Sequence, residues 1–363
     1  MRMKKILYIQ DHLGLGGITT VSASKQKYLV EHGYKVVNLF THYTPAPDIL
    51  SKYDERIKAV GIPLKRRERF LSVPVLGRIV WYIYFRVLFI VHILRYNPKF
   101  IVSTHQNLEP LTVVAATFWK RRFLEFHISG VDIAKSTIDR IRFKFKLRFY
   151  TLVSLTNGDA EDKYSALSQK TIVISNPVSC SDEYVSTCMS RKVIIPARFS
   201  PQKGLAQFLP YWKQIEEKHP DWELHLWGDG EEKEALIALK EKYALSTVFF
   251  NGYTNEVIKK IADCSIMLLP SMYEGFPTTL VEAMTCGVPC VAFDCKYGPR
   301  DIICDGEDGC LVEFKNYEQF IEKIDMLISN DSLRKAMGEK ARKNIRRYRL
   351  ENVMPKWEEV FDK

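Results

Sequence analysis

Short apolar runs alternate with longer segments of helical period along almost the whole chain. Runs of four to six apolar residues bounded by turn residues indicate buried strands, and apolar positions three and four apart indicate helices between them. A strand followed by a helix, repeated many times, is typical of α/β proteins with parallel sheets. We expect strands at residues 5–10, 35–40, 100–103, 123–126, 151–155, 171–174, 192–197, 223–227, 248–250, 265–269 and 288–293. Helices are expected from near Ile18 to just before Gly33 and from Leu205 to about Lys218.

The strand series is interrupted once, near residues 175–190, and this break predicts a domain boundary. A chain of 363 residues is long for one domain and natural for two. We therefore expect two α/β domains with parallel sheets, at residues 1–178 and 179–345. Residues 346–363 form a further helical segment.

The stretch PSMYEGFPTTLVEAMTCG, residues 270–287, carries the strongest candidate chemistry. Pro270 ends a buried strand, Pro277 suits the first position of a helix, and Gly287 suits its end. The first N–H groups of a helix have no partner within it and attract anions. The sequence therefore predicts an anion site at Thr278, Thr279 and Leu280, bracketed by the carboxylates of Glu274 and Glu282.

Two cations lie in the loop RFSPQKG, which follows the strand at 192–197. Carboxyl ends of parallel strands meet at one edge of a sheet, so Arg198 and Lys203 are expected near the anion site. No Asp-x-Asp motif occurs in the sequence. We therefore expect these cations, and no metal or other cofactor, to meet an anionic ligand.

Polar residues also follow strands in the first half. Gly16 and Gly17 lie in a loop between a strand and a helix, as in nucleotide-binding folds, but no acidic residue follows the strand at 35–40, which disfavours NAD. His105 and His127 follow two other strands, and Asp132 follows His127 closely. Strand-end histidines serve either the packing or a ligand, and the pattern alone leaves both open.

The first half is strongly basic, with 27 Lys and Arg against 13 Asp and Glu in residues 1–168. Two stretches combine basic and aromatic residues, at 65–98 and 140–150. Neither holds eighteen consecutive uncharged residues, so neither is expected to span a membrane. Each is either a buried helix or a helix that docks on an anionic bilayer.

The spacing EGFPTTLVE, with AMTCGVPCVAFD behind it, resembles the donor-binding signature of retaining glycosyltransferase family four, which has the GT-B fold. The resemblance implies two Rossmann-like domains with parallel sheets facing across a cleft. It also implies a UDP- or GDP-sugar donor whose ribose meets Glu282 and whose sugar lies beside Glu274. FHIS resembles the segment that carries the family's active-site histidine, here His127. The implied catalytic residues are His127, Glu274, Arg198 and Lys203. The implied donor-binding residues are Gly17, Arg198, Lys203, Gly228, Tyr253, Glu274, Gly275, Phe276, Pro277, Thr278, Thr279, Leu280 and Glu282, and the implied acceptor-binding residues are Gly16, His105 and Asp132.

The sequence GPRDII, residues 298–303, resembles transferases that build capsule or exopolysaccharide repeats on a lipid carrier, although Asp301 stands where many relatives have glutamate. The resemblance therefore implies a hexosyltransferase with a glycan or lipid-linked acceptor, and a last helix that returns to the first domain. A sugar-nucleotide epimerase of the same fold, or a non-catalytic carbohydrate- or RNA-binding protein, are the alternatives; as a transferase it needs no nucleic acid partner.

The start of the chain is not typical of a signal peptide, and the eight cysteines form no CxxC pair. These features favour the reducing cytosol. With the basic first half, they predict a cytoplasmic protein bound peripherally to the inner face of the cell membrane.

Overall fold

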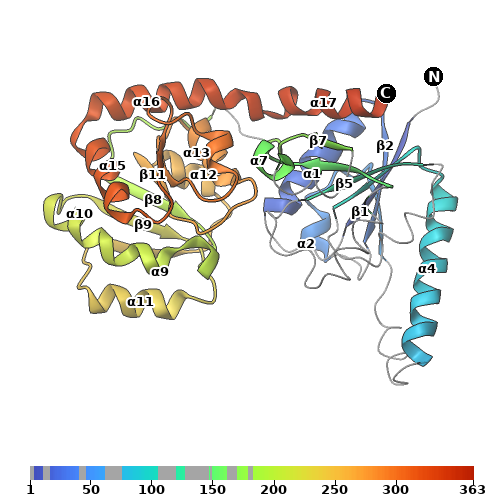
Figure 1. Ribbon diagram of the computed structural model, residues 1–363, viewed down its shortest axis with the longest axis horizontal. Helices are drawn as coiled ribbons and strands as arrows, with labels where there is room; N and C mark the ends of the chain where they lie inside the picture. The colour runs from blue at the N-terminus through green and yellow to red at the C-terminus, as the bar shows by residue number, and fades with distance from the viewer. Residues whose placement is uncertain are drawn as a thin grey trace. The chain divides into compact units, whose positions relative to one another are not determined.

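The computed structural model describes residues 4–10, 17–40, 46–61, 76–104, 120–126, 147, 149–161, 170–178 and 183–363. The chain divides into two compact units (Figure 1), one of residues 1–177 with 353–363 and the other of residues 178–352. The predicted site residues Gly16, His105, His127 and Asp132 lie outside the described residues, as do 140–146 of the second basic stretch.

The first unit is built on a seven-stranded sheet with the order β3-β2-β1-β4-β5-β6-β7. Every neighbouring pair is parallel. Most strands bury consecutive side chains, as sheets covered on both faces require. The strands are β1 Lys5–Gln10, β2 Lys35–Phe40, β3 Lys58–Gly61, β4 Phe100–Ser103, β5 Arg121–Glu125, β6 Thr151–Ser154 and β7 Thr171–Val173.

The helices of the first unit differ greatly in length. The longest is α4, Leu76–Tyr96, which lies at the margin of the unit in Figure 1. The helix α1, Gly17–Glu31, follows β1 and begins and ends where the sequence predicts. Apart from the last helix of the chain, the other helices described in this unit are α2, Pro47–Leu50, and α7, Asn157–Asp159.

The last helix, α17 (Leu350–Asp362), completes the core of the first unit. Phe361 is fully buried, with its ring centroid 4.8 Å from that of Phe100 and 5.6 Å from that of Phe123. Trp357 lies beside it and covers the ammonium group of Lys25, which is 4.6 Å from the ring centroid. Lys25 in turn donates to Glu125 at 2.5 Å, so two buried charges are paired beneath the helix.

The second unit is built on a six-stranded parallel sheet with the order β10-β9-β8-β11-β12-β13. Its strands are β8 Lys192–Pro196, β9 Glu223–Trp227, β10 Val248–Gly252, β11 Ile266–Leu269, β12 Cys290–Phe293 and β13 Cys310–Val312. The prediction of two parallel-sheet α/β domains is therefore confirmed.

Helices cover the sheet of the second unit (Figure 1). The helix expected at 205–218 is wrong as a single element, because Pro210 has no N–H for an α-helical bond and a 3₁₀ turn forms there. The elements are η2 Pro201–Lys203, α9 Leu205–Phe208, η3 Leu209–Tyr211, α10 Trp212–Lys218, α11 Lys233–Lys242, α12 Val257–Ala262, α13 Thr278–Thr285, α14 Pro299–Ile302, α15 Tyr317–Ser329, α16 Asp331–Asn344 and η4 Ile345–Tyr348.

Replacing Phe361 with alanine should destabilise the first unit by about 3–5 kcal/mol, because it removes a fully buried aromatic ring and leaves a cavity. Denaturant unfolding followed by circular dichroism measures the change. Lys356→Ala, on the exposed face of the same helix, is the control and should change stability by less than about 0.5 kcal/mol. Equal effects of the two substitutions would contradict a core role for α17.

Candidate functional site

Glu274, in the turn between β11 and α13, lies beside Lys203, which is 71 positions earlier in the sequence. Lys203 Nζ donates to Glu274 Oε1 at 2.7 Å. The exposed fraction is 20% for the lysine side chain and 6% for the glutamate side chain, so the pair is largely shielded from water but can be reached from the lysine side. Lys203 and Glu274 thus form one charged unit at the carboxyl ends of β8 and β11.

The loop after β8 is held against the end of β11 by backbone contacts. A Cβ atom on Gly204 would lie 2.2 Å from the carbonyl oxygen of Pro270, so only glycine fits at this position, where φ is 66°. The N–H of Met272 donates to the carbonyl of Gln202 at 2.8 Å. Gln202 Nε2 donates to the carbonyl of Tyr273 at 3.0 Å, a contact that no sequence pattern indicated.

Arg198, the other predicted cation, is in a different environment from Lys203. Its side chain is 75% exposed and its Nη2 is 3.2 Å from Glu231 Oε2. Exposed ion pairs contribute little to stability, so this pair can open at small cost. Arg198 is therefore available to an anionic ligand.

The helix α13 begins one residue later than predicted. Pro277 is its N-cap residue, with φ −71° and ψ 92°, rather than the first helical residue. The N–H of Leu280 donates to the Pro277 carbonyl at 3.0 Å, so the expectation of an open N–H at Leu280 is wrong. Helix geometry leaves the N–H groups of Thr278 and Thr279 without partners in the helix, and both residues are partly buried. The helix start therefore offers an anion two N–H groups, those of Thr278 and Thr279, and not the three that were predicted.

The turn before α13 is tightly packed. Phe276 and Pro277 are buried, and a Cβ atom on Gly298 would lie 2.7 Å from Pro277 Cδ and 2.8 Å from the Gly275 carbonyl oxygen. Gly298 has φ of 90°, which favours glycine. The sequence analysis did not predict that Gly298 packs against this turn, although the Gly-Pro pair at 298–299 indicates a tight turn.

Glu282 lies on the second turn of α13, where burial raises its carboxyl pKa to about 7. Desolvation disfavours the charged form, and desolvation is the cause of this shift. Near neutral pH the carboxyl therefore exists in both protonation states. Hydrogen-bond donors from a ligand would favour the ionised form.

Two predicted residues lie at the ends of β9 and β10. Gly228 has φ of 152°, and a Cβ atom there would lie 1.8 Å from the Ala197 carbonyl oxygen, so glycine is required where β8 and β9 end. Tyr253 is 62% exposed, so it does not pack in the core. Trp227 is partly buried, with Lys260 Nζ 5.2 Å from its ring centroid.

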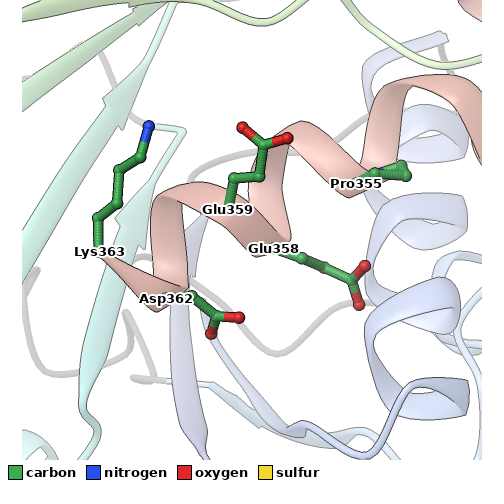
Figure 2. Close-up of a pocket in the computed structure, with 5 residues that line it drawn as sticks. All are labelled: Pro355, Glu358, Glu359, Asp362 and Lys363. Carbon is green, nitrogen blue, oxygen red and sulfur yellow. The ribbon is translucent and has the colours of Figure 1, made fainter.

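Other features do not add to this site. Gly17 is the first residue of α1. No group of three metal-ligating side chains occurs among the residues that the structure describes. A surface hollow in the first unit is lined by Pro355, Glu358, Glu359, Asp362 and Lys363 at the end of α17 (Figure 2). None of the predicted site residues lines it, and Asp362 is paired with Lys4.

The raised pKa of Glu282 predicts a pH-dependent stability. The folded-state value of about 7 lies above the ordinary value of 4.5, so the native state holds a proton that the unfolded state loses, and stability falls as pH rises from 4.5 to 7. Glu282→Gln should therefore stabilise the protein more at pH 8 than at pH 5, by about 1–3 kcal/mol in denaturant unfolding.

The control for this measurement is Glu322→Gln, which alters an exposed carboxylate on α15. It should change stability equally at the two pH values. A Glu282→Gln curve parallel to that of the natural protein would contradict the assignment.

The second unit also matches a known protein family. Residues 183–344 match the family model described as glycosyl transferases group 1. An uncharacterized glycosyltransferase of Haemophilus influenzae is 31% identical over 237 residues, which cover 64% of this chain and 64% of that protein. The amylovoran biosynthesis glycosyltransferase AmsD of Erwinia amylovora is 30% identical over 221 residues, covering 58% of this chain and 62% of AmsD. The chain thus spans less than two thirds of each of these relatives.

Solved structures show the same fold over the whole chain. A variant of S. aureus TarM, in complex with fondaparinux, alpha-GlcNAc-glycerol and UDP, has a TM-score of 0.82 at 17% identity and covers 99% of this chain and 100% of that chain. The two sheets are therefore the two domains of a GT-B fold. The segment that matches the glycosyl transferases group 1 model lies in the second of them.

Proposed function

We propose that the protein is a retaining glycosyltransferase of family four that moves a hexose from a UDP- or GDP-sugar to a glycan acceptor. The observation that carries this proposal is the placement of Lys203, Glu274 and the start of α13 together, at the carboxyl ends of β8 and β11. Open α/β sheets bind ligands at that edge. All of these residues lie within the segment that matches the group 1 family.

The proposed roles follow from the charge that develops in the reaction. As the glycosidic bond of a nucleotide sugar breaks, negative charge grows on the diphosphate leaving group and positive charge on the sugar. Lys203, Arg198 and the start of α13 are placed to stabilise the diphosphate. Glu274 would then lie beside the sugar, and Glu282 would accept hydrogen bonds from the ribose. His127, outside the described residues, is the proposed catalytic histidine of the first unit.

The relatives support a polysaccharide role. The name of AmsD assigns that protein to amylovoran biosynthesis, and TarM was solved with UDP. We propose by analogy a nucleotide-sugar donor and a lipid-linked acceptor in surface polysaccharide synthesis, such as a capsule. The epimerase and the non-catalytic binding protein are distinguished from this by the products formed.

A panel of UDP- and GDP-sugars, incubated with the protein and an extract of lipid-linked acceptors, tests the activity. We expect nucleotide release coupled to transfer of the sugar, with the anomeric configuration of the donor retained in the product. Because protein cations are proposed to replace a metal, excess chelator should leave the rate within about twofold. An isomerised donor would favour the epimerase, and no turnover with any donor would favour the binding protein.

Lys203→Ala should weaken nucleotide diphosphate binding about tenfold or more, since a charge-assisted contact contributes roughly 1.5–3 kcal/mol. Calorimetric titration with UDP and GDP measures the affinity. Lys203→Ala also leaves Glu274 unpaired, so the double variant Lys203→Met, Glu274→Gln serves as a second test without a lone buried charge. Lys335→Ala, at an exposed position of α16, is the control. Unchanged affinity in both site variants would contradict the role of Lys203.

The helix α4 supports a position at the membrane surface. Six of its apolar side chains are between 37% and 60% exposed: Val80, Ile83, Val87, Ile90, Val91 and Leu94. Spacings of three and four place them on one face of the helix. No acidic residue occurs from 76 to 99, and Arg95 and Lys99 are exposed. None of the helices among the described residues has the length and apolar character needed to cross a bilayer.

We therefore propose that this face of α4 inserts among lipid headgroups at the inner face of the cell membrane, where the acceptor of a cytoplasmic transferase would lie. An apolar helix face flanked by cations is suited to an anionic interface. The proposed partner of this exposed face is a lipid surface rather than a protein.

Co-sedimentation with vesicles tests the membrane role. The natural protein should pellet with anionic vesicles at low salt, and more weakly with neutral ones. Ile83→Glu with Leu94→Glu should abolish binding, because charges replace the two most exposed of these six side chains. Val185→Glu with Met189→Glu alters equally exposed apolar residues of the second unit and should bind as the natural protein does. Failure of the natural protein to pellet would contradict the proposal.

A further inference from the structure

Tyr348, in the short 3₁₀ helix η4, contacts three separate segments of the second unit. Its ring lies edge-on to that of Phe276, with centroids 5.1 Å apart and planes at 70°. Its hydroxyl donates to the Asp301 carbonyl at 2.5 Å. Its own carbonyl accepts from the N–H of Val178 at 3.0 Å. One buried residue thus connects the turn before α13 and the helix α14, through its side chain, with the segment at Val178, through its carbonyl.

Two of these contacts hold the turn before α13: the ring contact with Phe276 directly, and the hydrogen bond to the Asp301 carbonyl through α14. Phe276 and Tyr348 are 7% and 8% exposed, so the ring contact is sealed from water. On the other side, Gly298 at the start of α14 is in close contact with Gly275 and Pro277. Arg347 Nη2 also donates to the Ile302 carbonyl at 2.5 Å, so η4 holds α14 at two carbonyls. The position of the turn therefore depends on η4 directly and through α14.

The third contact, between the Val178 N–H and the Tyr348 carbonyl, lies where the chain passes between the two units. The chain leaves the first unit after Pro177 and returns to it at Val353. Within the second unit, Val178 forms a β-bridge with Arg349, next to its bond with the Tyr348 carbonyl. The two crossing segments are therefore hydrogen-bonded to each other at the residue that packs against Phe276.

We propose that Tyr348 is a positioning residue that couples the turn Tyr273–Phe276 to the two crossing segments of the chain. A donor that orders the turn orders Tyr348, and through its carbonyl and Arg349 it orders the crossing segments. This inference rests on the proposed function only in taking a nucleoside diphosphate as the ligand of the turn. Tyr348 contacts Phe276 and the Asp301 carbonyl, so its effect is transmitted through the turn before α13 and through α14.

Hydrogen exchange of the unliganded full chain provides the first test. Tyr348→Leu keeps an apolar side chain but loses the ring edge and the hydroxyl, and peptides covering residues 271–278 should exchange faster. Tyr348→Phe restores the ring and should return most of the protection. Tyr317→Leu, which removes a ring stacked on Tyr211 in the same unit, is the matched control and should leave exchange at 271–278 unchanged.

Nucleotide binding provides the second test. With UDP or GDP, whichever binds, the natural protein should gain protection at residues 174–178 and 346–352. Tyr348→Leu should lose that protection and bind the nucleotide about tenfold more weakly, an effect within the range of direct contact couplings. Tyr317→Leu should retain both. Equal losses in the two leucine variants, or no loss in Tyr348→Leu, would overturn the coupling.

The two tests separate failure of the inference from failure of the proposed function. If the natural protein binds neither nucleotide, the proposed donor is wrong. The unliganded exchange then decides alone: faster exchange at 271–278 in Tyr348→Leu only supports the coupling, and equal exchange in all variants overturns it.

Discussion

The candidate site of the second unit depends on the ion pair between Lys203 and Glu274. A carboxylate that is only 6% exposed is costly unless a cation faces it, so the loop after β8 and the turn after β11 must lie together. The close approach of Gly204 to the Pro270 carbonyl makes this possible. The same pairing leaves a fifth of the lysine side chain exposed, so an incoming anion can approach Lys203 while Glu274 still faces it.

Most of the fold could be predicted from the apolar runs, because strands buried on both faces leave continuous apolar segments. The strand β3 was not predicted from the sequence, because it lacks such an apolar segment. It lies at the edge of its sheet, its side chains are exposed or half-buried, and its four residues have no apolar run. The break at Pro210 was missed because helical periodicity continues through it, whereas the missing N–H acts only on the backbone.

The candidate site could be predicted as a set of residues but not as a set of contacts. Strand ends and the helix start located Lys203, Glu274 and Glu282, since their positions follow from local sequence. Which groups pair across 71 positions depends on loop geometry, so the sequence predicted two cations near Glu274 but not that Lys203 pairs with it and Arg198 with Glu231. Tyr348 had no local signal, because its contacts with Phe276 and Val178 exist only after the whole unit has folded.

A comparison of two buried ion pairs explains why one belongs to a site and the other to a core. Lys25 and Glu125 are 2% and 1% exposed, and Trp357 closes the lysine from above, so no ligand can reach either charge. Lys203 has the same kind of partner but keeps a fifth of its side chain exposed. Breaking the first pair would separate two buried charges where water does not reach. Because Lys203 is partly exposed, an anion can approach its ammonium group while Glu274 remains its partner, so neither charge loses its neighbour. A buried pair with one accessible cation is therefore stable without a ligand and open to one.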